Sequence, residues 1–196
     1  MTGIKFAFAL LAVLALSACY PPTTSHPVGT TVETKSDPAL VGLWKGTPED
    51  KTARGIYIHF LPMLDGTISA ILVQSGNEPD GDWYYVKLTT ARLGANRFLN
   101  ARMLIGDGTA EASDLAKGTV PLLYRFDAKG RLLIFSMDED ATKAAILSGK
   151  IKGTVEKGQM GDAVITADPK ALDKFLQSPA GLKLFSKPMF VLTKME

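Results

Sequence analysis

The sequence predicts a mainly β protein, with a single antiparallel β-barrel of about eight strands and one or two short helices near the C-terminal end. Apolar residues alternate with a period of two along several runs between residues 56 and 137. Clusters of Gly, Asp, Asn and Pro separate these runs, and helical spacing appears only later in the chain. A wide sheet must not leave its edges exposed, so closure into a barrel is the simplest arrangement.

The first half of the domain is expected to be a meander of hairpins. The first strand is expected at residues 41–45 and the second at 56–61. Asp65 and Gly66 then favour a tight turn into a third strand at 67–74. Residues 75–82 are rich in turn formers, so the chain should reverse there before strands at 83–91 and 98–105.

The second half combines strands with helix. After a long loop at 106–118, a hairpin is expected from strands at 120–126 and 131–137. A short helix at 138–148 begins with acidic residues, as the helix dipole favours, and brief strands follow at 151–155 and 163–167. Asp168 as N-cap and Pro169 at the first helical position mark another helix. The last strand, at 189–193, is expected to pair near the first and close the barrel.

The N-terminus has the three parts of a secretion signal. Lys5 precedes an apolar run at residues 6–16, and the small residues Ser17 and Ala18 follow. A membrane-spanning helix needs about 20 apolar residues, so this run is too short to remain as an anchor. Residues 1–18 are therefore predicted to be a signal peptide that is removed.

The end of this segment resembles the lipobox of bacterial lipoproteins, with the residues Leu16-Ser17-Ala18-Cys19. An ordinary signal peptidase, the alternative, prefers a small side chain where this chain has Leu16. The resemblance implies cleavage between Ala18 and Cys19, diacylglycerol on the thiol, and a further acyl chain such as palmitate on the new amino group. Tyr20 follows instead of the aspartate that retains many lipoproteins at the inner membrane. The expected location is thus the outer membrane, facing the periplasm.

Residues 19–37 are predicted to be a flexible tether before a barrel domain at 38–196. They are rich in Pro, Thr, Ser and Gly and lack apolar periodicity. Fully extended, a tether of this length would reach on the order of 60 Å. His26 falls within it and is expected to be solvated.

Charge and cysteine content exclude several classes of function. The 22 basic residues lose only Lys5 with the signal peptide, which leaves 21 against 20 acidic residues. Without clustered Lys and Arg, nucleic acid is not an expected partner. With Cys19 lipidated, no thiol remains for a disulfide or a soft metal site, and no cofactor is expected.

The start of the predicted barrel resembles the lipocalins. Gly42-Leu43-Trp44 is similar to the G-x-W motif of their first strand. The resemblance implies that Trp44 plugs the closed end of the barrel and that residues 36–40 form a short entry turn. The expected helix near residue 140 departs from the family pattern, and an unrelated barrel or a sandwich is the alternative.

Catalytic chemistry finds little support, and the protein is predicted not to be an enzyme. His59, the only histidine of the expected domain, lies on a strand where a packed or surface role is expected. No nucleophile elbow, zinc-binding H-E-x-x-H or P-loop motif occurs. The acids at 138–140 fit a solvated helix start better than a calcium loop, so no metal site is expected.

The expected function is that of a noncatalytic envelope lipoprotein, anchored in the membrane through Cys19. Its barrel would bind a small apolar ligand or an envelope protein, with the rings at 83–85 either covering the rim or forming a recognition surface. A structural or assembly role is one alternative. The other is a hydrolase that uses carboxylates, for which the candidates are Asp65, Asp80, Asp82 and Asp107.

Overall fold

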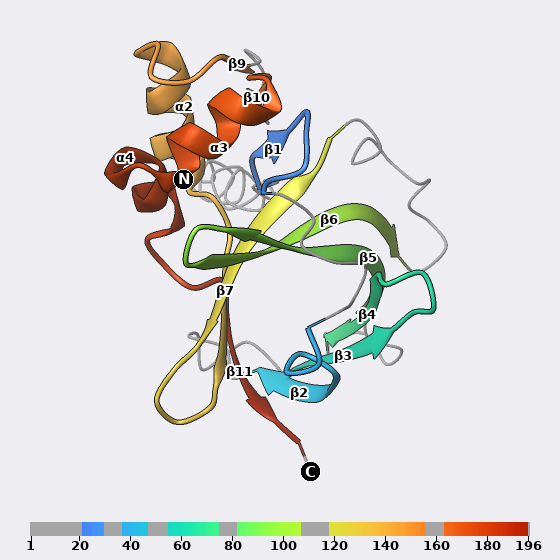
Figure 1. Cartoon of the computed structure of the whole chain (residues 1–196). Helices are drawn as coiled ribbons and strands as arrows, with labels where there is room; N and C mark the ends of the chain where they lie inside the picture. Colours follow the sequence, from blue (N-terminus) through green and yellow to red (C-terminus); the bar gives the residue numbers. More distant parts are fainter. Residues whose placement is uncertain are drawn as a thin grey trace, which may run out of the picture.

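The computed structural model of the chain contains a closed antiparallel barrel of eight strands (Figure 1). It describes residues 21–29, 37–46, 55–74, 82–106, 118–155 and 163–195. The barrel strands are β2 (Gly42–Gly46), β3 (Ile56–Pro62), β4 (Ile68–Gln74), β5 (Asp82–Leu93), β6 (Asn96–Gly106), β7 (Val120–Phe126), β8 (Leu132–Phe135) and β11 (Phe190–Lys194). The predicted fold class is therefore confirmed.

The barrel closes through its last strand, as the sequence predicted. β11 pairs with β8 on one side and with β2 on the other, so Leu192 lies opposite both Leu132 and Gly46. All other neighbours in the barrel are consecutive in the sequence. Hairpin formation between successive strands and the two long-range pairings of β11 thus account for the topology of the barrel.

The interior of the barrel is packed with apolar side chains. Every strand contributes at least one buried residue to this cluster, because alternate residues of a strand point to the same face. Its largest members, Trp44 and Phe60, are each 2% exposed. Among the described residues, its buried members are Leu40, Trp44, Ile58, Phe60, Ile68, Ala70, Leu88, Leu99, Tyr124, Leu132, Ile134 and Leu192.

A second group of elements forms a cap on one side of the barrel (Figure 1). Here the cap means the helices α2 (Glu139–Leu147), α3 (Pro169–Gln177) and α4 (Pro179–Leu182), the 3-10 helix η3 (Lys183–Phe185) and a sheet of three short strands. The strand order in that sheet is β1 (Thr23–Thr24), β10 (Ala163–Ile165) and β9 (Gly153–Val155). The brief strands expected after residue 150 are therefore present, but they lie outside the barrel.

The helices begin where their capping residues predict. The side chain of Asp138 accepts a hydrogen bond from the amide of Ala141, and that of Asp168 accepts one from Ala171. These bonds satisfy amide groups that have no partner within the helix. Pro169 occupies the start of α3, where its missing N–H costs nothing.

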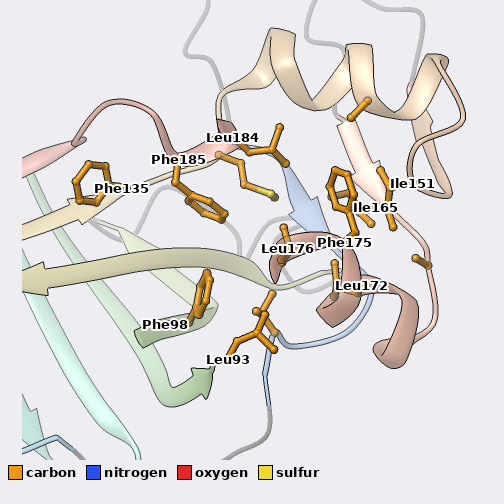
Figure 2. Close-up of a cluster of buried hydrophobic side chains, with 14 residues drawn as sticks. Leu93, Phe98, Phe135, Ile151, Ile165, Leu172, Phe175, Leu176, Leu184 and Phe185 are labelled. Carbon is orange, nitrogen blue, oxygen red and sulfur yellow. The ribbon is translucent and has the colours of Figure 1, made fainter. Parts of the chain in front are cut away.

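A second apolar core joins the cap to the barrel (Figure 2). Phe98 of β6 and Phe135 of β8 point outward into this core, whereas their neighbours Leu99 and Ile134 point into the barrel. The ring of Phe98 packs edge-on against that of Phe185, with centroids 5.7 Å apart. β6 and β8 thus carry apolar side chains on both faces, and each forms part of two cores.

Residues 21–29, which fall within the expected tether, pack against the domain. β1 pairs in parallel with β10, and the backbone groups of Thr24 and Thr119 exchange two hydrogen bonds of 2.8 Å. Val28 is completely buried, and Asn100 accepts from its amide at 2.8 Å and donates to its carbonyl at 3.0 Å. Residues 30–36 of the expected tether lie outside the described residues.

The Asn100 side chain is expected to hold this segment in place. Asn100→Ala would leave the buried amide and carbonyl of Val28 without partners, which we expect to cost about 1–3 kcal/mol of unfolding free energy. Denaturant unfolding, together with protease cleavage between residues 21 and 29, measures the effect. Asn96→Ala, at the hairpin end of the same strand, is the control. Equal effects of the two changes would contradict the assignment.

Two predicted turns and the signal segment fall outside the described residues. These are residues 75–81, 107–117 and 1–20. Within the described part of the chain, no helix has the length and apolar character needed to cross a bilayer. The domain boundaries at residues 18 and 37 stay predictions.

Candidate functional site

Several residues singled out by the sequence have no described position. Ala18 and Cys19, at the predicted cleavage and lipidation site, lie outside the described residues, as do Asp80 and Asp107. Lipidation of Cys19 therefore rests on the sequence motif.

The two remaining candidate acids of a hydrolase are far apart. Asp65 lies in the turn before β4, whereas Asp82 begins β5 opposite Gln74 at the other end of β4. β4 has seven residues, so at about 3.3 Å per residue the two positions are roughly 20 Å apart. Carboxylates that flank a glycosidic bond lie about 5–9.5 Å apart. Asp65 and Asp82 therefore do not form such a pair.

The contacts of Asp65 suit a turn rather than an acid catalyst. Its carboxylate accepts hydrogen bonds from the hydroxyl and the amide of Thr67, and Lys87 forms an ion pair with it at 3.0 Å. The bonds from Thr67, followed by that from Lys87, lower the pKa of Asp65 to about 2. A general acid at neutral pH needs the opposite shift.

The acids at 138–140 serve the start of α2. Asp138 is the N-cap, Glu139 forms an ion pair with Lys143 one turn later, and Asp140 is exposed. Among the described residues, no three His, Cys, Asp or Glu side chains gather in a way that could hold a metal ion.

Trp44 lies beneath the turn that leads into the barrel. Residues 37–41 form that turn, and the indole N–H of Trp44 donates to the carbonyl of Leu40 at 2.7 Å. The ring lies 6.0 Å from that of Phe126, and the Lys194 ammonium is 5.5 Å from its centroid. These contacts are compatible with the plug predicted for Trp44.

Asp37 clamps the same turn to the barrel, a role that the sequence did not indicate. Its carboxylate accepts from the Tyr124 hydroxyl at 2.8 Å and from Arg97 Nη1 at 3.2 Å. Burial, and secondarily the bond to Asp37, raises the pKa of the Tyr124 hydroxyl above its ordinary value. The Asp37 carboxylate is held by two partners from β6 and β7, an arrangement that fixes the turn.

The outward face of β2–β5 is the strongest candidate for a functional surface. The inward residues of these strands belong to the barrel core, so the residues between them point outward. Register places the outward residues in two rows across the four strands. The rows are Lys45, Tyr57, Val73 and Trp83, and Leu43, His59, Ile71 and Tyr85; these eight residues are called the outer wall.

The outer wall is apolar and open to solvent. Leu43, Val73 and Trp83 are 38%, 42% and 44% exposed. Figure 1 shows β2, β3 and β4 on the side of the barrel away from the helices of the cap. The outward side chains of Phe98 and Phe135, on β6 and β8, are buried in the core shared with the cap, whereas no described element covers the outer wall. Of the elements that the structure describes, the cap covers one side of the barrel and none covers the opposite side.

The outer wall also carries two residues with basic side chains, His59 and Lys45. His59 is exposed and lies between Leu43 and Ile71 across the strands, so its position agrees with the surface role expected from the sequence. The Lys45 ammonium lies 5.8 Å from the ring centroid of Tyr57. Aromatic rings with polar edges are frequent at binding surfaces. The arrangement can bind an apolar surface without any chemical step.

The ring cluster at 83–85 divides as expected between the two faces. Trp83 and Tyr85 belong to the outer wall, and the Tyr85 hydroxyl bonds to that of Ser69 at 2.8 Å. Alternation within each strand predicts which of its residues point outward. Grouping the outward residues of β2–β4 with these rings into one surface also needs the register of four strands, which alternation within one strand does not provide.

No protein-family model, no curated protein and no solved structure matches this chain. The closed eight-stranded barrel is compatible with the lipocalin-like resemblance of residues 42–44.

Proposed function

We propose that this protein is a lipid-anchored lipoprotein of the bacterial envelope that uses its outer wall to bind another envelope protein. In this proposal the barrel is a noncatalytic docking module. Cys19 carries the lipid, and the outer membrane, on its periplasmic side, is the expected location.

The observation that carries the proposal is the contrast between the inside and the outside of the barrel. Twelve buried residues from the entry turn and all eight strands pack together inside, which disfavours a small ligand there. Outside, Leu43, Val73 and Trp83 are exposed on a face that none of the described elements covers. Contiguous exposed apolar residues are typical of surfaces that bind other proteins.

The anchor is supported by the sequence alone. The order of Lys5, an apolar run and Leu16-Ser17-Ala18-Cys19 fits a lipoprotein signal. Two or more acyl chains on one residue hold a protein stably at a bilayer, whereas one chain does not.

Cross-linking in intact cells tests the docking function. A photoreactive phenylalanine analogue at position 73 is expected to give a discrete adduct with an envelope protein. In the same chain, Trp83→Glu should weaken that adduct roughly tenfold or more, because loss of a central aromatic residue typically costs 2 kcal/mol or more of binding energy. Denaturing gel electrophoresis and mass spectrometry identify the cross-linked protein.

Two controls make this result specific. The analogue at position 129, in the exposed turn between β7 and β8, should give no such adduct. Trp83 is on the surface, so Trp83→Glu should leave the thermal unfolding midpoint nearly unchanged. An adduct of twice the monomer mass would show that the partner is a second copy of this chain and not a different envelope protein. An adduct whose yield does not change with Trp83→Glu would overturn the proposal.

The small-ligand alternative has its own test. Native mass spectrometry of the protein extracted with its lipids should show the mass of the lipidated chain alone. A bound apolar molecule that persists after Trp83→Glu would favour a ligand inside the barrel instead of docking on the outer wall.

A further inference from the structure

A depression in the cap gathers positive charge. It has a volume of about 640 Å³, which is within the usual range for small-ligand pockets. Lys150 and Lys152 reach it from the segment between α2 and β9, and Lys174 reaches it from α3. We call these three side chains and the depression they line the lysine pocket.

The charge of the lysine pocket is not neutralised by its neighbours. The three lysines are exposed, and within the described part of the chain none of them forms an ion pair. Asp168 also lines the pocket, but its carboxylate accepts the amide of Ala171 as the N-cap of α3. Among the described residues that line the pocket, one acid against three ammonium groups leaves a net positive site.

Apolar groups adjoin these charges. Phe175 and Ile151 form buried parts of the pocket lining and belong to the core of the cap. Leu147, at the end of α2, is 77% exposed, although it lies only three residues before Lys150. Exposed apolar side chains and lysines occur together on surfaces that bind the interface of an anionic bilayer.

The docked N-terminal segment keeps the lysine pocket near the predicted lipid. Residues 21–29 are packed on the cap, and His26 lines the pocket. His26 is seven positions after Cys19 in the sequence, so the two lie at most about 25 Å apart. A bilayer that holds the lipid on Cys19 is therefore close to the pocket.

We propose that the lysine pocket binds the phosphate of an anionic phospholipid headgroup, while Leu147 enters the bilayer interface beside it. The folded cap then contacts the membrane directly, which goes beyond an anchor formed by acyl chains. The argument from distance rests on the proposed anchor at Cys19, whereas the charge and shape of the pocket do not.

Vesicle binding by the unlipidated chain tests this proposal without the anchor. The chain from residue 20 onward is used, because both apolar cores are built from residues after that point. Sedimentation with vesicles of phosphatidylcholine and phosphatidylglycerol is compared with sedimentation with phosphatidylcholine alone. Binding is expected only to the anionic vesicles. K150Q/K152Q/K174Q should weaken it roughly 100-fold, since each lysine near such a surface contributes about 1 kcal/mol, which is about a factor of five in affinity.

Matched variants separate the pocket from net charge. K45Q/K129Q/K194Q removes three exposed lysines of the barrel and should bind like the unmodified chain. K150R/K152R/K174R retains the positive charges and should also bind. Leu147→Gln leaves the charge unchanged and should weaken vesicle binding without affecting the unfolding midpoint.

Three outcomes would overturn the proposal. Equal loss of vesicle binding in the two glutamine triple variants would show a general charge effect. Unchanged vesicle binding in both would show that the lysines do not bind headgroups. Inorganic phosphate is titrated in parallel and followed by NMR. Phosphate binding that depends on the three lysines, without vesicle binding, would identify a soluble phosphate compound as the ligand and exclude the headgroup. Failure of Cys19 lipidation would leave all of these measurements unaffected.

Discussion

Changing Cys19 to serine is expected to move the protein from the membrane fraction to the soluble fraction of the envelope. The change removes the thiol that would carry diacylglycerol, and without it the new N-terminus would not be acylated. Fractionation after a high-salt wash is the measurement, because salt screens the binding of lysines to anionic lipids and leaves an acyl anchor in place. Nearly complete release is expected.

The control for this prediction lies in the described part of the same segment. Ser25→Ala changes an exposed hydroxyl six residues after Cys19 and should leave the protein in the membrane fraction. Mass spectrometry of the unmodified protein should show the added lipid on the residue that follows Ala18. Retention of the serine variant in the washed membranes would contradict the lipobox assignment.

Truncation of Phe98 is expected to have the largest effect on stability. Phe98→Ala should lower the unfolding free energy by about 3–5 kcal/mol, the usual cost of deleting a buried phenyl ring. The ring is completely buried and packs against Phe185 between barrel and cap. Denaturant unfolding followed by circular dichroism measures the loss.

Leu99→Ala is the matched control for Phe98→Ala. It removes a side chain from the other face of the same strand, inside the barrel, and should cost about 2–5 kcal/mol. Because β6 contributes to both cores, each variant should still unfold in a single transition with the cap and the barrel together. A separate early transition of the cap in Phe98→Ala would contradict this coupling.

Most of the barrel could be predicted from local patterns. Alternation along residues 56–61 and the Asp65-Gly66 turn predict a hairpin, and the structure places β3 and β4 there. Asp168 and Pro169 mark the start of α3 because capping depends on neighbouring residues alone. Closure of the barrel by β11 could also be predicted, because an open sheet edge would expose unpaired N–H and C=O groups.

The cap was harder to predict because its contacts join distant residues. Thr23 and Thr24 have no apolar pattern, yet Thr24 is completely buried through its pairing with Thr119 and the neighbouring β10. Asn100 binds a residue 72 positions earlier in the sequence, which no local signal indicates. Segments of this kind resemble linkers in composition, and only tertiary contacts distinguish the two.

The candidate site was only partly predictable for a similar reason. The rings at 83–85 were identified as possible contacts, and Trp83 does lie on the outer wall. Leu43, Val73 and Ile71 were expected on strands, but their assembly into one face depends on strand register. The lysine pocket joins three segments, and each lysine alone is an ordinary surface residue.

The parallel pairing of β1 with β10 has a mechanical consequence for a chain anchored at Cys19. A pull on the lipid would reach the domain through Pro21 and act along the axis of β1. The hydrogen bonds of Thr24 to Thr119, and of Val28 to Asn100, run across the chain direction, so they would share the load in shear instead of opening one after another. The segment would therefore resist force along the chain better than its two-residue strand suggests. A pulling force from the bilayer would act on β6 and the cap before it could change the structure of the outer wall.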